Sequence, residues 1–240
     1  MTAPVLEISA VTKDYRGLRP LRMEQLRVGE GEHVAILGFD APTAEVFVNL
    51  VTGASLPDSG EIRIFGRPTS GIADSADWLA TIDRFGIVSE RAVLLEQLTV
   101  VQNLAMPFSL EIEPPPEDTQ RQAEALAAEV GLAPASWNRP VADLDATGRL
   151  RVRLGRALAL GPSVLLLEHS SAACEPESVP AIGREIRAIA QGRRVAIVAA
   201  TADEAFARTA AVRILVLDAA TGRLREQSAR RWFGRRPRLG

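Results

Sequence analysis

The stretch Gly38-Phe39-Asp40-Ala41-Pro42-Thr43-Ala44-Glu45-Val46 has the setting of a phosphate-binding loop. It follows the apolar run 33–37 and leads into apolar residues at helical spacing, so its backbone N–H groups open a helix, where anions bind. A triphosphate loop also needs several glycines, a lysine that neutralises the phosphates and a hydroxyl that ligates Mg²⁺. This loop has one glycine and no lysine. Its residues alone therefore indicate only a strand, a turn and a helix.

Lysine, histidine and cysteine are scarce in the whole chain. Of the 28 basic residues only Lys13 is a lysine, and the two histidines are His33 and His169. A mechanism that needs a lysine or a histidine therefore has very few candidates. Cys174 is the only cysteine and cannot close an internal disulfide.

The composition bounds the class of protein. With 240 residues, 47% hydrophobic and 24% charged residues and a net charge of -2, the chain is typical of an α/β globule. No apolar run reaches the roughly 18 residues that a membrane span needs, and residues 1–10 do not have the charge and apolar pattern of a signal peptide. We expect a cytoplasmic protein.

Strand and helix signals alternate along the chain, which predicts a parallel sheet. Expected strands cover 6–10, 21–28, 33–37, 61–65, 86–89, 163–167, 194–199, 211–217 and 223–226. Expected helices cover 42–51, 74–82, 99–106, 117–130, 148–160 and 177–191. These elements put the loop at 38–46 at the end of a buried strand.

Five runs of residues carry a resemblance to a known family. They are 31–38 (GEHVAILG), 49–53 (NLVTG), 57–66 (PDSGEIRIFG), 94–107 (LLEQLTVVQNLAMP) and 149–168 (RLRVRLGRALALGPSVLLLE). Together they resemble the nucleotide-binding cassette of ABC transporters, over roughly residues 5 to 226. The resemblance implies an α/β fold: a P-loop NTPase core with a mostly parallel sheet and an N-terminal antiparallel β subdomain. It also implies one cassette over residues 1–226, with a helical subdomain at about 91–158 inserted in the core.

At the family's chemical positions this chain carries other residues. The resemblance puts the P-loop lysine at Ala44, the Mg²⁺-ligating serine at Glu45 and two loop glycines at Ala41 and Thr43. It puts the sensing glutamine at Glu90. With Tyr15, which matches the aromatic residue that stacks on adenine, the nucleotide-binding equivalents are Tyr15, Gly38, Thr43, Ala44, Glu45 and Val46. A partly buried surface tyrosine is the alternative for Tyr15.

The remaining motif positions differ in the same way. The LSGGQ signature falls at Leu144-Asp145-Ala146-Thr147-Gly148, and the Asp-Glu pair that ends a core strand falls at Glu168 and His169. The D-loop aspartate is Glu175 and the switch histidine is Ala202. His169 is a possible general base, but a residue that ends a strand is the simpler interpretation. Glu168 either keeps a negative charge near the metal position or is hydrogen-bonded at the strand end.

These replacements predict a degenerate cassette, a pseudo-ATPase without catalytic residues. The resemblance implies ATP and Mg²⁺ as ligands, but we expect no obligatory cofactor and no metal site, because Glu45 places an anion where polyphosphate and metal meet. The implied partners are an integral membrane permease subunit, which docks in a groove with the segment 90–107 as one wall, and a second cassette in a homodimer or heterodimer. The chain is then a structural or regulatory subunit at the inner face of the membrane.

Two alternatives remain open, and so does the role of the C-terminus. The chain is either a weakly active ATPase that powers transport or a soluble regulator outside transport. The last 18 residues of the chain contain seven arginines and one glutamate. We expect residues 227–240 to be a disordered tail; contact with an anionic membrane surface is the alternative, and no nucleic-acid partner is expected.

Overall fold

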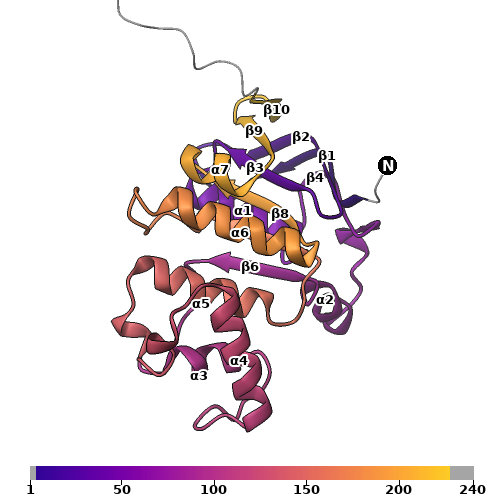
Figure 1. The fold of residues 1–240 in the computed structure, drawn as a ribbon. Helices are drawn as coiled ribbons and strands as arrows, with labels where there is room; N and C mark the ends of the chain where they lie inside the picture. Colours follow the sequence, from indigo (N-terminus) through magenta and orange to yellow (C-terminus); the bar gives the residue numbers. More distant parts are fainter. Residues whose placement is uncertain (1–3, 228–240) are drawn as a thin grey trace, which may run out of the picture.

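The computed structural model describes residues 4–227, arranged around two β-sheets with helices against them (Figure 1). The predicted tail at 227–240 lies outside these residues apart from Gln227, so the expectation for it stays a prediction. The α/β class and the mostly parallel sheet are confirmed.

An antiparallel sheet opens the chain. Its strands are β1 (Pro4–Lys13), β2 (Leu21–Gly29), β4 (Ser59–Ile64) and β5 (Arg67–Pro68), in the order β2-β1-β4-β5. The register between β1 and β4 shifts after Ser9, and there Gly60 (φ +84°) passes so close that a Cβ atom would lie 2.3 Å from the carbonyl oxygen of Ala10. The bulge therefore requires glycine at this position.

A six-stranded sheet forms the centre of the molecule. Its order is β10 (Arg223–Glu226), β9 (Arg213–Asp218), β3 (His33–Leu37), β8 (Ala196–Thr201), β7 (Val164–Glu168) and β6 (Phe85–Ser89). All neighbours pair in parallel except β10, which is antiparallel to β9. Every residue of β3, β7 and β8 is buried. A strand covered on both faces needs a continuous apolar run, which is the pattern these three segments have in the sequence.

Side chains that alternate along these strands divide the core in two. Val34 and Ile36 of β3 pack with helix α1 (Ala41–Val51) and the antiparallel sheet. Ala35 and Leu37 face the other way, toward α6 (Val179–Arg193), α7 (Glu204–Ala210) and the helices beyond β6. The central sheet thus separates α1 from the remaining large helices.

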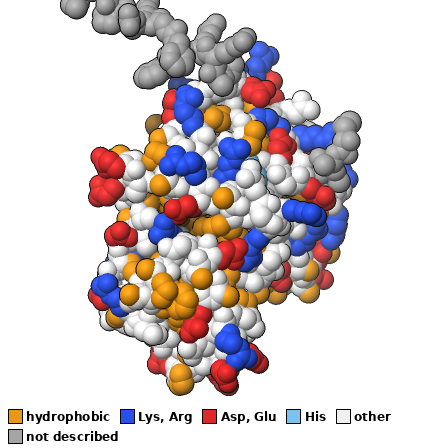
Figure 2. All heavy atoms as spheres, in the orientation of Figure 1, with side chains coloured by type: hydrophobic (Ala, Val, Ile, Leu, Met, Phe, Trp, Pro, Cys, Tyr) orange, Lys and Arg blue, Asp and Glu red, His pale blue; other side chains and the backbone are white. Residues whose placement is uncertain are grey.

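Three helices form a layer beyond the edge strand β6: α3 (Val100–Ala105), α4 (Glu117–Glu129) and α5 (Ala146–Leu158) (Figure 1). In Figure 2 apolar side chains gather in a patch on this lower part, with charged side chains of both signs around it and over the upper part. Helix α5 lies against β6 at Gly86, where a Cβ atom would come within 2.4 Å of the carbonyl oxygen of Ala157. Below, α3, α4 and α5 are together called the helical layer.

The expected elements match the structure except at some ends, in the two-residue strand β5 and in one short helix, neither of which was expected. Helix α2 (Ser75–Ile82) begins after Asp74, because the Asp74 carboxylate caps it and accepts a hydrogen bond from the N–H of Asp77. The short helix α7 was not expected. It has seven residues and follows the capping residue Asp203, a length at which helical periodicity carries little signal.

Candidate functional site

The loop between β3 and α1 ends in a capped helix. The Asp40 carboxylate accepts a hydrogen bond of 2.8 Å from the N–H of Thr43. Hydrogen bonding to Thr43, first by its side chain and then by its N–H, lowers the pKa of Asp40, and the nearby His169 lowers it further. A negative charge of the chain itself therefore lies at the positive end of α1.

The residues after Asp40 present no cation on this helix. Ala44 is fully buried, Val46 is half-buried against the core, and the Glu45 side chain is 47% exposed. Gly38 precedes them at φ +101°, where a Cβ atom would lie 2.8 Å from the carbonyl oxygen of Leu217. This glycine lets the loop cross β9 closely.

Arg91 pairs with Glu168 in a bidentate geometry. Its Nε atom donates to Glu168 Oε1 at 2.8 Å and its Nη2 atom donates to Oε2 at 2.6 Å. Its Nη1 atom also donates to Glu45 Oε1 at 3.3 Å. One guanidinium thus joins the α1 carboxylate to the carboxylate at the end of β7.

Strand pairing explains this contact. Ser89 ends β6 and lies opposite Glu168, the last residue of β7, in the parallel register. The Ser89 hydroxyl then accepts a hydrogen bond from the N–H of Arg91, which fixes the turn two residues on. Glu168 is 7% exposed, and its hydrogen bonds raise the pKa of Arg91 above its usual value. The charged form of Arg91 is therefore stabilised by this pairing.

Tyr15 borders the same loop. Its hydroxyl lies 2.9 Å from the hydroxyl of Thr43, and the ring packs against the core behind α1. A hollow of about 310 Å³ opens beside these two residues and Gly38. The structure thus brings Tyr15, Gly38, Thr43 and Glu45 to one end of α1.

His169 and Ala202 lie in a second hollow, of about 470 Å³, with Ser171 and Asp203. His169 adopts φ +43°, and its Nε2 atom has no hydrogen-bond partner within the described part of the chain. The Ser171 hydroxyl donates to Asp203 at 3.0 Å. In the part of the chain that the structure describes, no hydrogen bond or ion pair joins the His169 ring to Arg91 or Glu168.

The other predicted positions are not bonded to the Arg91 side chain within residues 4–227. Asp145 caps α5 by accepting a hydrogen bond of 2.7 Å from the N–H of Gly148. The Thr147 hydroxyl lies 3.3 Å from Ser178 near the start of α6, and half-buried Leu144 packs against the core. Glu175 and Glu90 are exposed.

Sequence reasoning missed Arg91, although its neighbour Glu90 was singled out. The available signal was a basic residue next to that position in a site with an excess of carboxylates. Among residues 4–227 no group of histidine, cysteine, aspartate and glutamate side chains is arranged to hold a metal ion.

Comparison with known proteins identifies the family. The family model described as ABC transporter matches residues 21–171, more than half of the chain. The chain belongs to the ABC transporter family. It is 30% identical over 218 residues to the methionine import ATP-binding protein MetN of Brucella abortus, a match that covers 90% of this chain and 58% of that protein. It is 26% identical to the lipoprotein-releasing system ATP-binding protein LolD of Saccharophagus degradans, over 87% of this chain and 92% of that protein.

Solved structures of other ABC proteins have the same fold as this ABC transporter chain. For cbiO1 of Clostridium perfringens, part of the ABC transporter complex cbiONQ, the TM-score is 0.76 at 19% identity, over 92% of this chain and 87% of that one. For the ATP-binding cassette MJ0796 bound to ADP and Pi, it is 0.74 at 23% identity, over 94% and 99%. The chain spans little more than half the length of MetN. None of the helices in the described residues has the length and apolar character to span a bilayer.

Proposed function

We propose that this chain is a cassette subunit of an ABC transport system that binds and hydrolyses little or no ATP, and that it acts as a structural or regulatory partner at the inner face of the membrane. The observation that carries the proposal is the charge arrangement at α1. Asp40, Glu45 and Glu168 surround the position at which a metal-bound triphosphate would meet the helix, and Arg91 is already bonded to two of them.

The residues at this position do not fit Mg²⁺-ATP. Ala44 brings no positive charge, and Glu45 offers a carboxylate in the place of a hydroxyl. Loss of one partner from a buried charge pair costs about 2–5 kcal/mol. At about 1.4 kcal/mol per decade, the affinity falls roughly 30-fold to several-thousand-fold. Repulsion between Glu45 and the phosphates lowers it further.

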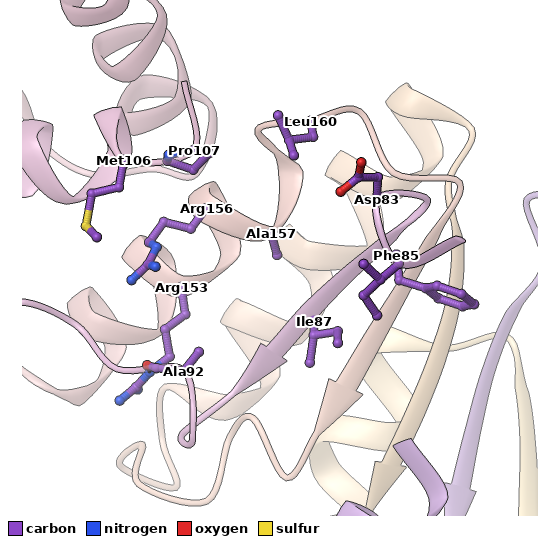
Figure 3. A pocket seen from close by; sticks show the side chains of 11 residues that line it. Asp83, Phe85, Ile87, Ala92, Met106, Pro107, Arg153, Arg156, Ala157 and Leu160 are labelled. Carbon is purple, nitrogen blue, oxygen red and sulfur yellow. Dashed lines mark hydrogen bonds between the residues drawn. The ribbon is translucent and has the colours of Figure 1, made fainter. Parts of the chain in front are cut away.

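A groove between β6 and the helical layer supports the proposed membrane partner. It has a volume of about 400 Å³, and Figure 3 shows apolar residues on both sides of it, Met106 and Pro107 opposite Ile87 and Phe85. Such a groove suits a short amphipathic segment of a permease.

Two arginines of α5 give this groove a preference for a negatively charged partner. Arg153 and Arg156 line it together with the carboxylate of Asp83 (Figure 3), and within residues 4–227 neither arginine forms an ion pair. Their hydrogen bonds go to backbone carbonyl oxygens, from Arg153 to Ala92 at 3.3 Å and from Arg156 to Val93 at 2.7 Å. A permease segment with an acidic residue would complement them.

Co-purification from the native cell tests the proposed partnership. The wild-type chain is expected to bring down a membrane permease, and the charge-reversal pair Arg153→Glu with Arg156→Glu is expected to lose it. Arg208→Glu, on the exposed side of α7, is the matched control and keeps the partner. A chain that brings down no membrane protein contradicts the transport assignment and favours a soluble regulator. Mg²⁺-ATP turnover by the purified chain that disappears on His169→Ala favours a weak ATPase.

A further inference from the structure

The segment that contains Arg91 is attached to both parts of the molecule. Through its side chain Arg91 is bonded to β7 and α1, at Glu168 and Glu45. The residues that follow it are bonded to the helical layer: Ala92 and Val93 accept hydrogen bonds from two arginines of α5. Arg91 therefore fastens this segment to the central sheet, beside the hydrogen bond from the N–H of Ala92 to the carbonyl oxygen of Ser89.

The segment stays attached to the helical layer up to the start of α3. The fully buried Asn103 side chain accepts from the N–H of Leu95 and donates to its carbonyl oxygen, both at 2.9 Å. Leu94 is 8% exposed and belongs to the apolar cluster that the helical layer shares with one face of the central sheet. A movement of the helical layer relative to β7 would therefore strain the Arg91 ion pair together with this shared apolar packing.

Around Arg91 and the N-terminus of α1, the chain balances its own charges without a ligand. The buried Glu168 carboxylate requires a positive partner, and the bidentate Arg91 guanidinium supplies it from the chain itself. At the N-terminus of α1 the Asp40 carboxylate supplies the negative charge in the same way. Arg91 therefore supplies the positive charge that a metal ion would bring, and Asp40 supplies the negative charge that a phosphate would bring.

We propose that Arg91 acts as a built-in cation that fastens the helical layer to the central sheet, so that the arrangement of the two parts does not depend on nucleotide or metal. This inference deepens the proposed function, because it names the charge pair that takes the place of the ligand. Only the relevance of the inference to transport rests on the proposed function. Its test needs no partner protein.

Hydrogen exchange on the full chain measures directly how firmly the helical layer is held to the central sheet. In Arg91→Ala, amide exchange in 92–105 and 146–158 is expected to accelerate about tenfold, because the buried Glu168 is left without its partner. Arg91→Lys keeps the charge and is expected to restore part of the protection. Arg67→Ala, which removes an exposed bidentate pair with Asp77, is the matched control and leaves these segments unchanged.

Metal binding gives a second, independent readout. Titration with Mn²⁺ alone is expected to show binding to Arg91→Ala at least tenfold tighter than to the wild type, because Glu45 and Glu168 then face each other without a cation. Adding Glu168→Gln to Arg91→Ala is expected to abolish that binding and to recover exchange protection. If Arg91→Ala matches the Arg67→Ala control in exchange and gains no Mn²⁺ binding, the inference is wrong. Mg²⁺-ATP turnover by the wild type would instead contradict the proposed function.

Discussion

Arg91 and Glu168 are 77 positions apart in the sequence, and they meet because β6 and β7 pair in parallel with Ser89 opposite Glu168. The position of Glu168 at the end of its strand was predictable from the apolar run before it. Its partner was not, because a turn residue carries no periodicity and a long-range ion pair leaves no local signal. By contrast, the cap formed by Asp40 is a local feature whose residue type is typical of a helix start.

The absence of a cation on α1 and of a hydroxyl at position 45 gives the first prediction. Ala44→Lys with Glu45→Ser is expected to raise the affinity for Mg²⁺-ATP at least about tenfold, because an attraction replaces a repulsion. Turnover is expected to stay negligible, since His169 and Ala202 remain unchanged. Ala44→Met with Glu45→Ser controls for side-chain length without the charge. Equal affinities for the two double variants, or turnover restored by the lysine variant, would contradict the account of this loop.

The close contact between β6 and α5 gives a prediction at the scale of elements. Gly86→Ala is expected to lower the free energy of unfolding by about 1–3 kcal/mol or more, because the added methyl group meets the Ala157 carbonyl oxygen at 2.4 Å. Gly192→Ala near the end of α6 is the control: nothing lies within 4 Å of its added Cβ, so it is expected to be neutral or stabilising by up to about 1 kcal/mol. Denaturant unfolding of both variants measures the change in the free energy of unfolding. Equal values for the two variants would show that the sheet and α5 can separate at little cost.

The first residue of β3 gives a pH-dependent prediction. Burial lowers the pKa of His33, the hydrogen bond to the Val195 carbonyl oxygen partly opposes this, and Arg187 lowers it further. The unfolded chain therefore binds a proton below about pH 6.5 that the folded chain does not, and stability falls as the pH drops from 7 to 5.

The slope for one proton is at most about 1.4 kcal/mol per pH unit. Unfolding in denaturant at several pH values is expected to show a flatter profile for His33→Gln than for the wild type. A wild-type slope that survives in His33→Gln would assign the proton to another group.

The elements themselves were largely predictable, for physical reasons that differ between them. β3, β7 and β8 appear as continuous apolar runs because both faces are covered, and α5 appears through its helical period because one face is buried against β6 and α3. The short α7 escaped prediction because its stability comes from packing Phe206 into the core rather than from local pattern.

At the scale of the whole molecule, the two altered motifs lie on different parts of the cassette: the loop at α1 and the segment 144–148 at the start of α5. The family resemblance implies that each hydrolytic site is shared, with the loop of one cassette facing the signature of the other. A homodimer of this chain would then have two incomplete sites. A heterodimer with an intact cassette would have one site with a complete loop facing Asp145.

That arrangement predicts how an isolated complex behaves. ATPase activity is expected in the complex only when an intact cassette is present, and it is expected to disappear when that partner's loop lysine is replaced. Replacement of Ala44 or His169 in this chain is expected to leave the activity unchanged. A homodimer of this chain that hydrolyses ATP at the rate of an ordinary transporter would contradict the proposed division of roles.

The central claim, that the chain's own charges occupy the site where Mg²⁺-ATP would bind, is tested most directly by calorimetric titration of the full wild-type chain with ATP in the presence of Mg²⁺. Because Arg91 is already paired with Glu45 and Glu168 and Asp40 caps α1, no binding tighter than about millimolar is expected. A dissociation constant in the micromolar range would contradict the account.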